Sequence, residues 1–221
     1  MDDYERFAEP NSVHHQIWDA LACELAKDGY AQPGFPGIFV KPITGSWRAW
    51  ISVGGRSVEL TPLIGVFDEE LFDIRMRALE TLGRTFPRRQ DGPPLIMPTL
   101  ERLAANCPAC STDAPWRFSG EILKTSVADD LVACLRKHAY PFLQAHASLP
   151  AVFDAWKNKM GGYSMPFYVP IVLIKLARLD ALTTYVDSRL RRIPDEGHAL
   201  EYRQYVNTIL RMFSLPDLPD S

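Results

Sequence analysis

Two cysteines in the middle of the chain form the motif closest to a known chemical site. Cys107 and Cys110 enclose Pro108 and Ala109, the CxxC spacing of redox dithiols and of zinc ligands. A redox pair places its first cysteine at a helix N-terminus after a strand, whereas this motif follows residues 101–106, which have a helical pattern. A structural zinc site needs four ligands, and one CxxC supplies only half of them. We therefore expect two loop thiols with no bound metal.

An acidic run is the second candidate, and it consists of Asp68, Glu69, Glu70 and Asp73. Neighbouring carboxylates can hold a divalent cation. At the start of a helix, however, the helix dipole already favours negative side chains, and Asp68 also fits an N-cap. The pattern therefore favours a helix that begins at Asp68 over a metal site.

The histidines do not have the spacing of a metal or catalytic site; they are His14, His15, His138, His146 and His198. Adjacent residues on a helix diverge by about 100°, so the first two cannot share a metal-binding face. The chain also lacks the G-x-S-x-G, H-E-x-x-H and P-loop patterns. The sequence thus predicts neither a catalytic set nor a cofactor.

Two groups of arginines invite a phosphate-binding interpretation: Arg84, Arg88 and Arg89, and further along Arg189, Arg191 and Arg192. The second group falls in a predicted last helical turn, where the helix dipole favours cations. The first group lies in a predicted loop, and three charges make only a weak phosphate site.

The segment from Trp47 to Phe67 has the clearest structural pattern in the chain. In both halves of it, apolar residues recur at a period of two, which is typical of strands with one buried face. We expect the turn between the strands at Gly54 and Gly55, both at positive φ, as a tight hairpin requires. A helix then begins at Asp68. These elements predict a mixed α and β fold.

Helical periodicity dominates the remaining chain. A first helix is predicted over residues 11–29, and the chain is predicted to be helical from residue 121, with a break at residues 140–142. Short strands are predicted at 38–41, 95–97 and 116–118. The last three helices are predicted over 166–178, 181–192 and 198–213.

The length of the chain is compatible with one large domain. We expect a single domain over residues 1–221. Its helix-and-sheet portion ends near residue 120, a helical portion over residues 121–215 packs on it, and residues 216–221 form a mobile tail.

Composition argues against several classes of protein. No window in the sequence approaches the run of about 18 apolar residues that a transmembrane helix needs. The N-terminus is acidic and lacks the apolar region of a secretory signal, so we expect a cytoplasmic protein with reduced thiols.

Charge is distributed unevenly along the chain. Residues 1–80 carry thirteen acidic and seven basic side chains, whereas the remainder carries fourteen and seventeen. An acidic first third argues against nucleic-acid binding there, because phosphate backbones are bound by basic surfaces. It suits a basic protein partner, although an ordinary solvated surface has the same pattern.

Five packing motifs give the chain a resemblance to a group of known proteins: Gly29-Tyr30, Trp47-Arg48-Ala49-Trp50, residues 58–66, Trp116-Arg117-Phe118 and Tyr140-Pro141-Phe142-Leu143. Over about residues 15–210, the chain resembles uncharacterised bacterial cytosolic proteins, some of which are encoded beside secreted polymorphic toxins and taken for immunity proteins. The resemblance implies an α+β fold, with a curved antiparallel sheet of three to five strands backed by helices and a helical C-terminal half. It brings no catalytic residue. The family would have a plainer loop at residues 107–110.

Two classes of function follow. The first is a non-enzymatic protein-binding module without a cofactor, most concretely an immunity protein that neutralises a bacterial toxin by direct binding. The second is a metal-dependent hydrolase or phosphate-handling enzyme with a dispersed acidic site at residues 68–73 and the arginine loop. The lack of a recognisable catalytic set favours the first.

For a binding module, we expect the partner to contact exposed aromatic residues ringed by charge, because interface hot spots are rich in Trp, Tyr and Arg. Trp50 and Arg48 share the strand face opposite Ile51. If helices leave that face open, Trp50 is the anchor; otherwise it belongs to the core, as central strand tryptophans more often do. The acidic residues expected to steer a basic toxin domain are Glu59, Asp68, Glu69 and Glu70.

Overall fold

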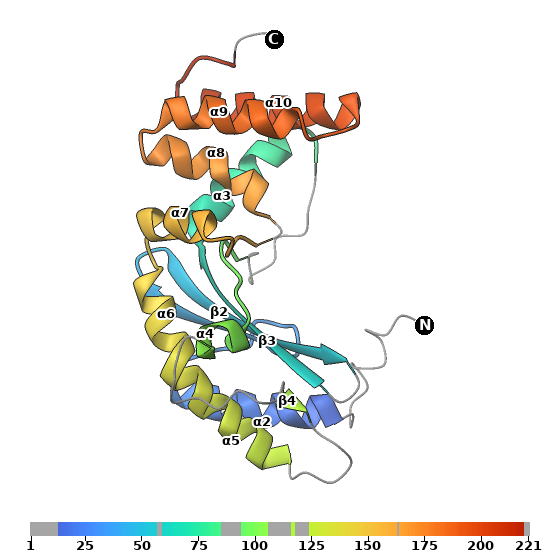
Figure 1. Cartoon of the computed structure of the whole chain (residues 1–221), viewed down its shortest axis with the longest axis vertical. Coiled ribbons are helices and arrows are strands. Elements are labelled where there is room, and N and C mark those ends of the chain that lie inside the picture. The colour runs from blue at the N-terminus through green and yellow to red at the C-terminus, as the bar shows by residue number, and fades with distance from the viewer. Residues whose placement is uncertain are drawn as a thin grey trace.

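An antiparallel sheet in the order β1-β2-β3-β4 lies at the centre of the molecule (Figure 1). The computed structural model describes residues 13–56, 59–84, 94–105, 116–117, 124–162 and 164–218. The strands are β1 (Ile38–Thr44), β2 (Trp47–Arg56), β3 (Glu59–Asp68) and the two-residue β4 (Trp116–Arg117). With the helices described below, the sheet confirms the predicted α+β fold and its helical C-terminal half.

The predicted turn at Gly54 and Gly55 is wrong, because both glycines continue β2. Gly54 pairs with Thr61 and Gly55 pairs with Leu60, and Gly54 does not have a positive φ. The register is set by the buried rows of the two strands, which place Ile51 opposite Ile64. The residues between the two strands, 57–58, lie outside the described residues.

Two helices cover one face of the sheet. They are α2 (Val13–Lys27) and α5 (Lys124–Cys134), which lie side by side below the strands in Figure 1. The indole Nε1 of Trp18 on α2 donates to the carbonyl oxygen of Val53 at 2.7 Å. This bond fixes α2 against the buried row of β2, because a buried indole N–H needs an acceptor.

The opposite face of β2 is also covered, and this decides the position of Trp50. Trp50 is only 7% exposed, and Phe67 on the neighbouring strand is buried too. Trp50 lies opposite Gly65, where an added Cβ would come within 2.5 Å of the Ile96 carbonyl oxygen. The face is therefore not open, and Trp50 belongs to the interior.

The segment around Ile96 runs along the outer edge of β3, where a short strand was expected. Leu95 N donates to the Val66 carbonyl oxygen at 2.8 Å, and Ile64 N donates to that of Pro98 at 2.9 Å. These bonds satisfy the edge of β3 over part of its length.

One helix leads from the sheet into the helical half, and it is α3 (Glu69–Thr81). It begins as predicted, since the Asp68 carboxylate accepts from Leu71 N at 2.9 Å. The later helices are α4 (Leu100–Ala104), a π-helix η1 (Leu135–Ala139), α6 (Tyr140–Ala145), α7 (Leu149–Lys157), α8 (Met165–Lys175), α9 (Leu179–Leu190) and α10 (Glu196–Met212). Buried apolar side chains of the sheet and of these helices form one continuous core.

The expected helix break at residues 140–142 does not occur. The chain passes from α5 through η1 into α6, with Pro141 in the first turn of α6. The wider π turn allows this, because proline lacks an N–H and is tolerated where a helical segment starts.

The described end of the predicted tail is attached to α10. Arg211 forms an ion pair with Asp217, and Leu218 N donates to Asn207 Oδ1 at 3.0 Å. No helix in the described parts of the chain has the length and apolar character needed to cross a bilayer.

Candidate functional site

The predicted partner-binding residues cluster near the start of α3, but most of them are already engaged. Arg48 Nη2 lies 2.6 Å from Glu69 Oε2, and Lys175 Nζ lies 2.5 Å from Glu70 Oε1. Asp68 is buried, where it caps α3 and accepts from Ser46 Oγ at 2.7 Å. These carboxylates thus join the sheet to helices α3 and α8.

Two further residues were predicted to contact the partner. Trp50 is buried, and the side chain of Glu59 lies outside the described residues. Cys107 and Cys110 lie outside them as well, as do Arg88 and Arg89. Within the described ranges, no group of three or more His, Cys, Asp or Glu side chains could hold a metal ion.

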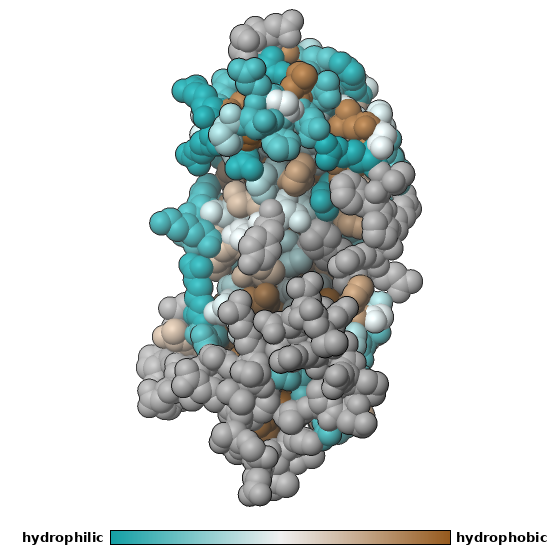
Figure 2. All heavy atoms as spheres, turned by 90° about the vertical axis from the view of Figure 1, so that its right-hand side faces the viewer, coloured by the Kyte–Doolittle hydropathy of each residue, from teal (hydrophilic) through white to brown (hydrophobic). Residues whose placement is uncertain are grey.

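The helical half presents a different site. Figure 2 shows the helical half at the top as a mainly hydrophilic surface interrupted by hydrophobic side chains. A cavity of about 650 Å³ opens between α3, the start of α8 and the α9–α10 pair. We call it the arginine groove, and its arginine, histidine and glutamate lining residues are Arg75, Arg84, Arg189, Arg192, His198 and Glu201.

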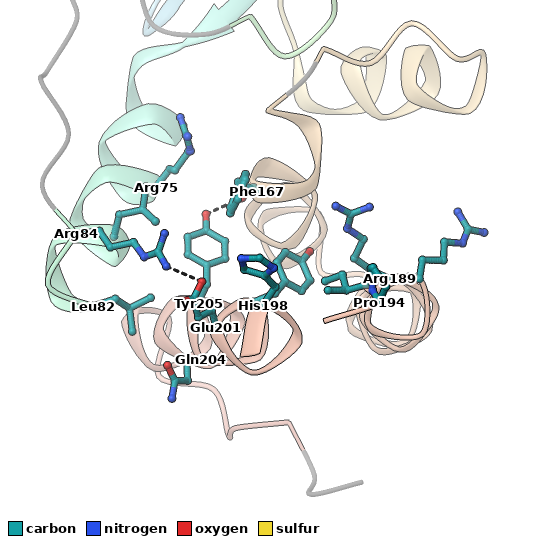
Figure 3. Close-up of a pocket in the computed structure, with 14 residues that line it drawn as sticks. Arg75, Leu82, Arg84, Phe167, Arg189, Pro194, His198, Glu201, Gln204 and Tyr205 are labelled. Atoms are coloured by element: carbon teal, nitrogen blue, oxygen red, sulfur yellow. Dashed lines mark hydrogen bonds and ion pairs between the residues drawn. The ribbon is translucent and has the colours of Figure 1, made fainter. Parts of the chain in front are cut away.

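The C-terminal end of α3 forms one side of the arginine groove. Gly83 has a φ of +72°, so the chain reverses there, and Arg84 N donates back to the Leu79 carbonyl oxygen at 3.0 Å. Arg84 then reaches α10, where its Nη2 lies 2.5 Å from Glu201 Oε2 (Figure 3). This ion pair ties α3 to α10.

Arg75 lies earlier on α3 than Arg84, and its guanidinium group packs against aromatic rings. Its guanidinium carbon lies 5.4 Å from the ring centroids of both Phe167 and Tyr168. Its Nε is buried and has no hydrogen-bond partner. Arg75 therefore adds positive charge to the wall of the groove without a described carboxylate to neutralise it.

The connection between α9 and α10 forms the other side of the arginine groove. Arg189 is in the last turn of α9, and Arg192 follows where the chain turns. Asp195 then caps α10 by accepting from His198 N at 2.8 Å. Because the connection is short, Arg189, Arg192 and His198 border the same cavity (Figure 3).

Two tyrosines of α10 form a rigid floor. Tyr205 OH donates to the Phe167 carbonyl oxygen at 2.6 Å, and Tyr202 OH donates to that of Pro166 at 2.9 Å. Burial raises the pKa of both tyrosines far above its ordinary value, so both hydroxyls remain protonated donors. These bonds hold α10 against the first turn of α8, where the carbonyl groups lie.

The charges of the groove do not cancel. Glu201 neutralises Arg84, but neither Arg189 nor Arg192 has an ion-pair partner among the described residues. The Nε of Arg189 is also buried without a hydrogen-bond partner. Guanidinium groups present paired N–H donors that match carboxylate and phosphate oxygens. Arg189 and Arg192 therefore present to the groove guanidinium groups of the kind that pair with anions.

Sequence reasoning identified Arg84, Arg189 and Arg192 separately, as members of two arginine groups. It did not bring them together, because the two groups lie about a hundred residues apart. It gave Arg75 no role. Arg75 carries no local signal, since a single arginine on an amphipathic helix is an ordinary surface residue.

Comparisons of the chain with models of protein families, with curated proteins and with solved structures give no match. Its function has to be inferred from its own residues.

Proposed function

We propose that this chain is a protein-binding module that holds an acidic segment of its partner in the arginine groove. The observation that carries the proposal is the convergence of Arg84, Arg189 and Arg192 on one cavity from different segments of the chain. Two of these cations lack a described ion-pair partner, so an incoming carboxylate meets an unbalanced positive field.

The size of the groove favours a segment over a single ion. A volume of about 650 Å³ is in the range of pockets that enclose a sizeable ligand. Its floor, made by Tyr202 and Tyr205, is rigid and partly aromatic. Rigid aromatic walls with arginines at the rim are the composition of interface hot spots.

The sequence resemblance to immunity proteins makes a bacterial toxin domain the concrete partner. The charge expected of that partner changes, however. A basic toxin was expected because of Glu69 and Glu70, and both of these carboxylates are paired with Arg48 and Lys175. The arginine groove instead requires acidic side chains on the toxin.

The test is the binding of a fluorescein-labelled peptide made of glutamates, followed by fluorescence anisotropy. We expect binding that weakens as salt rises, because exposed charge pairs are screened. Arg192→Glu should weaken it about tenfold. Arg191→Glu is the matched control, because Arg191 is exposed, adjacent in sequence and does not line the groove in the described structure. Equal losses in the two variants would refute the proposal.

A second experiment distinguishes the protein-binding module from the alternative, a phosphate-handling protein. Inorganic pyrophosphate should compete only weakly with the peptide if the groove recognises carboxylates spread along a segment. If pyrophosphate raises the melting temperature while the glutamate peptide does not bind, the groove belongs to a phosphate-bearing small molecule and the protein-binding proposal fails.

A further inference from the structure

A second depression adjoins the arginine groove on the other side of α9. It has a volume of about 730 Å³ and lies between α7, α8 and α9. We call it the apolar groove, and its main apolar lining residues are Phe153, Trp156, Met165, Val169, Leu173 and Tyr185.

Two polar residues of the apolar groove, Lys157 and Thr184, are engaged with groups of the chain itself. Lys157 is paired with Asp154 at 2.8 Å, and its Nζ lies 4.7 Å from the ring centroid of Phe153. Thr184 Oγ1 donates to the Asp180 carbonyl oxygen of its own helix at 3.0 Å. Both side chains therefore already have partners. Most of the remaining side chains that line the groove are apolar.

The two grooves are continuous across Arg189 and Arg192, which line both of them. Tyr185 of the apolar groove and Tyr202 of the arginine groove are also close neighbours, since each contributes to the pKa shift of the other. A ligand carboxylate on Arg189 and Arg192 therefore lies at the border of both grooves.

We infer that one segment of the partner occupies both grooves, and that this segment is acidic and apolar together. The inference rests on the proposed function and specifies its ligand. The acidic side chains pair with Arg189 and Arg192, and the neighbouring large apolar side chains enter the apolar groove. Charge complementarity selects the acid, and burial of apolar surface adds affinity that an acid alone cannot supply.

The length of α9 sets the size of the segment. Its 12 residues extend for about 18 Å at a rise of 1.5 Å per residue. A ligand lying along it corresponds to about five residues in extended form or about twelve in a helix. Short amphipathic segments bind grooves of this kind through an apolar face.

Three labelled peptides of equal length test the inference by anisotropy: one of leucine and glutamate, one of serine and glutamate, and one of leucine and lysine. We expect the leucine–glutamate peptide to bind about tenfold more tightly than the serine–glutamate peptide, and the leucine–lysine peptide to bind least.

The variant is Thr184→Gln, which places a larger polar side chain in the apolar groove. Its matched control is Thr183→Gln. Both threonines are exposed and bond a carbonyl one turn back on α9, but Thr183 lines neither groove as described. Glutamine favours helices more than threonine, so neither variant should unfold α9. Thr184→Gln should weaken the binding of the leucine–glutamate peptide several-fold and leave the binding of the serine–glutamate peptide unchanged.

The outcomes separate this inference from the proposed function. If the two glutamate peptides bind equally and Arg192→Glu weakens the binding of both, the apolar groove is not part of the site. The proposal for the arginine groove would then still hold. If the leucine–lysine peptide binds as well as the leucine–glutamate peptide, the charge assignment is wrong. If neither glutamate peptide binds, both proposals fail.

Discussion

Arg136 holds the carboxylate of Asp28 with two hydrogen bonds, from Nε at 2.9 Å and from Nη2 at 3.2 Å. Asp28 follows α2, and Arg136 belongs to the π-helix η1. Tyr140 OH donates to the same carboxylate at 2.7 Å. Lys41 Nζ lies within 6 Å of the ring centroids of both Tyr30 and Tyr140, so this cluster also includes β1. One carboxylate thereby joins two helices beside the sheet.

The Asp28 cluster predicts a loss of stability at low pH. The hydrogen bond from Arg136 lowers the pKa of Asp28 below its ordinary value, so the carboxylate stabilises the folded state when ionised. The stabilisation is complete above the unfolded-state pKa of about 3.9 and is lost as pH falls through the lower folded-state pKa.

Asp28→Asn should remove this contribution and lower the free energy of unfolding by about 1–2 kcal/mol at pH 7. Urea unfolding at several pH values measures it. The difference from wild type should shrink at the most acidic pH. The control is Asp19→Asn, on the exposed side of α2. An equal loss in the control would mean that net charge, and not the Arg136 bond, is responsible.

The Arg84–Glu201 pair predicts a variant that binds more tightly. Glu201→Gln leaves the Arg84 guanidinium without its carboxylate, so the arginine groove gains one uncompensated positive charge. The affinity for the glutamate peptide should rise several-fold, measured by anisotropy. Both side chains are about half exposed, so the free energy of unfolding should change by less than about 1 kcal/mol. Glu196→Gln, at the exposed start of α10, should leave affinity unchanged; a comparable rise there would show a general charge effect.

Two glycines in the hairpin predict opposite outcomes. An alanine at Gly65 would bring its Cβ within 2.6 Å of Pro94 Cβ and 2.5 Å of the Ile96 carbonyl oxygen, so Gly65→Ala should destabilise by about 2–4 kcal/mol. An alanine at Gly54 meets no atom within 4 Å, and its backbone is that of a strand. Gly54→Ala should be neutral or stabilise by up to about 1 kcal/mol. A marked loss for Gly54→Ala in urea would restore the turn to the position predicted from the sequence.

Three buried tryptophans differ in one bond, and this predicts their tolerance to phenylalanine. Trp18 Nε1 and Trp156 Nε1 donate to carbonyl oxygens at 2.7 and 2.8 Å, whereas Trp50 Nε1 is buried without a partner. Trp50→Phe removes that unsatisfied donor. It should cost about 1–2 kcal/mol less free energy of unfolding than Trp18→Phe or Trp156→Phe. Equal costs would show that ring volume alone matters.

The sequence predicted those elements whose pattern is local. Period two in residues 47–67 located β2 and β3, and the helix start at Asp68 followed from its capping chemistry. The turn was misplaced because glycine marks conformational tolerance, while the register is decided by which apolar rows meet. Trp50 could be assigned to a strand face, but only the packing of distant segments shows whether that face is covered.

The arginine groove lay beyond sequence reasoning for a related reason. Arg84 and Arg192 were visible as charges, but their meeting depends on α3 and α10 packing side by side. Local spacing cannot describe a site whose parts are brought together only by the core. The ion pairs of Glu69 and Glu70 were likewise out of reach, because their partners, Arg48 and Lys175, lie on other elements.

Helix α3 connects the sheet with the groove, and each of its ends is fastened. Asp68 and Ser46 fix its start to the sheet, and Arg84 with Glu201 fixes its end to α10. One face of α3 is also buried in the core, so the helix opens only together with the rest of the fold. The amide protons in its middle turns should therefore exchange with solvent only when the whole molecule unfolds, at the slowest rate in the chain. Occupation of the groove should slow that exchange further and, through α3, protect the sheet as well.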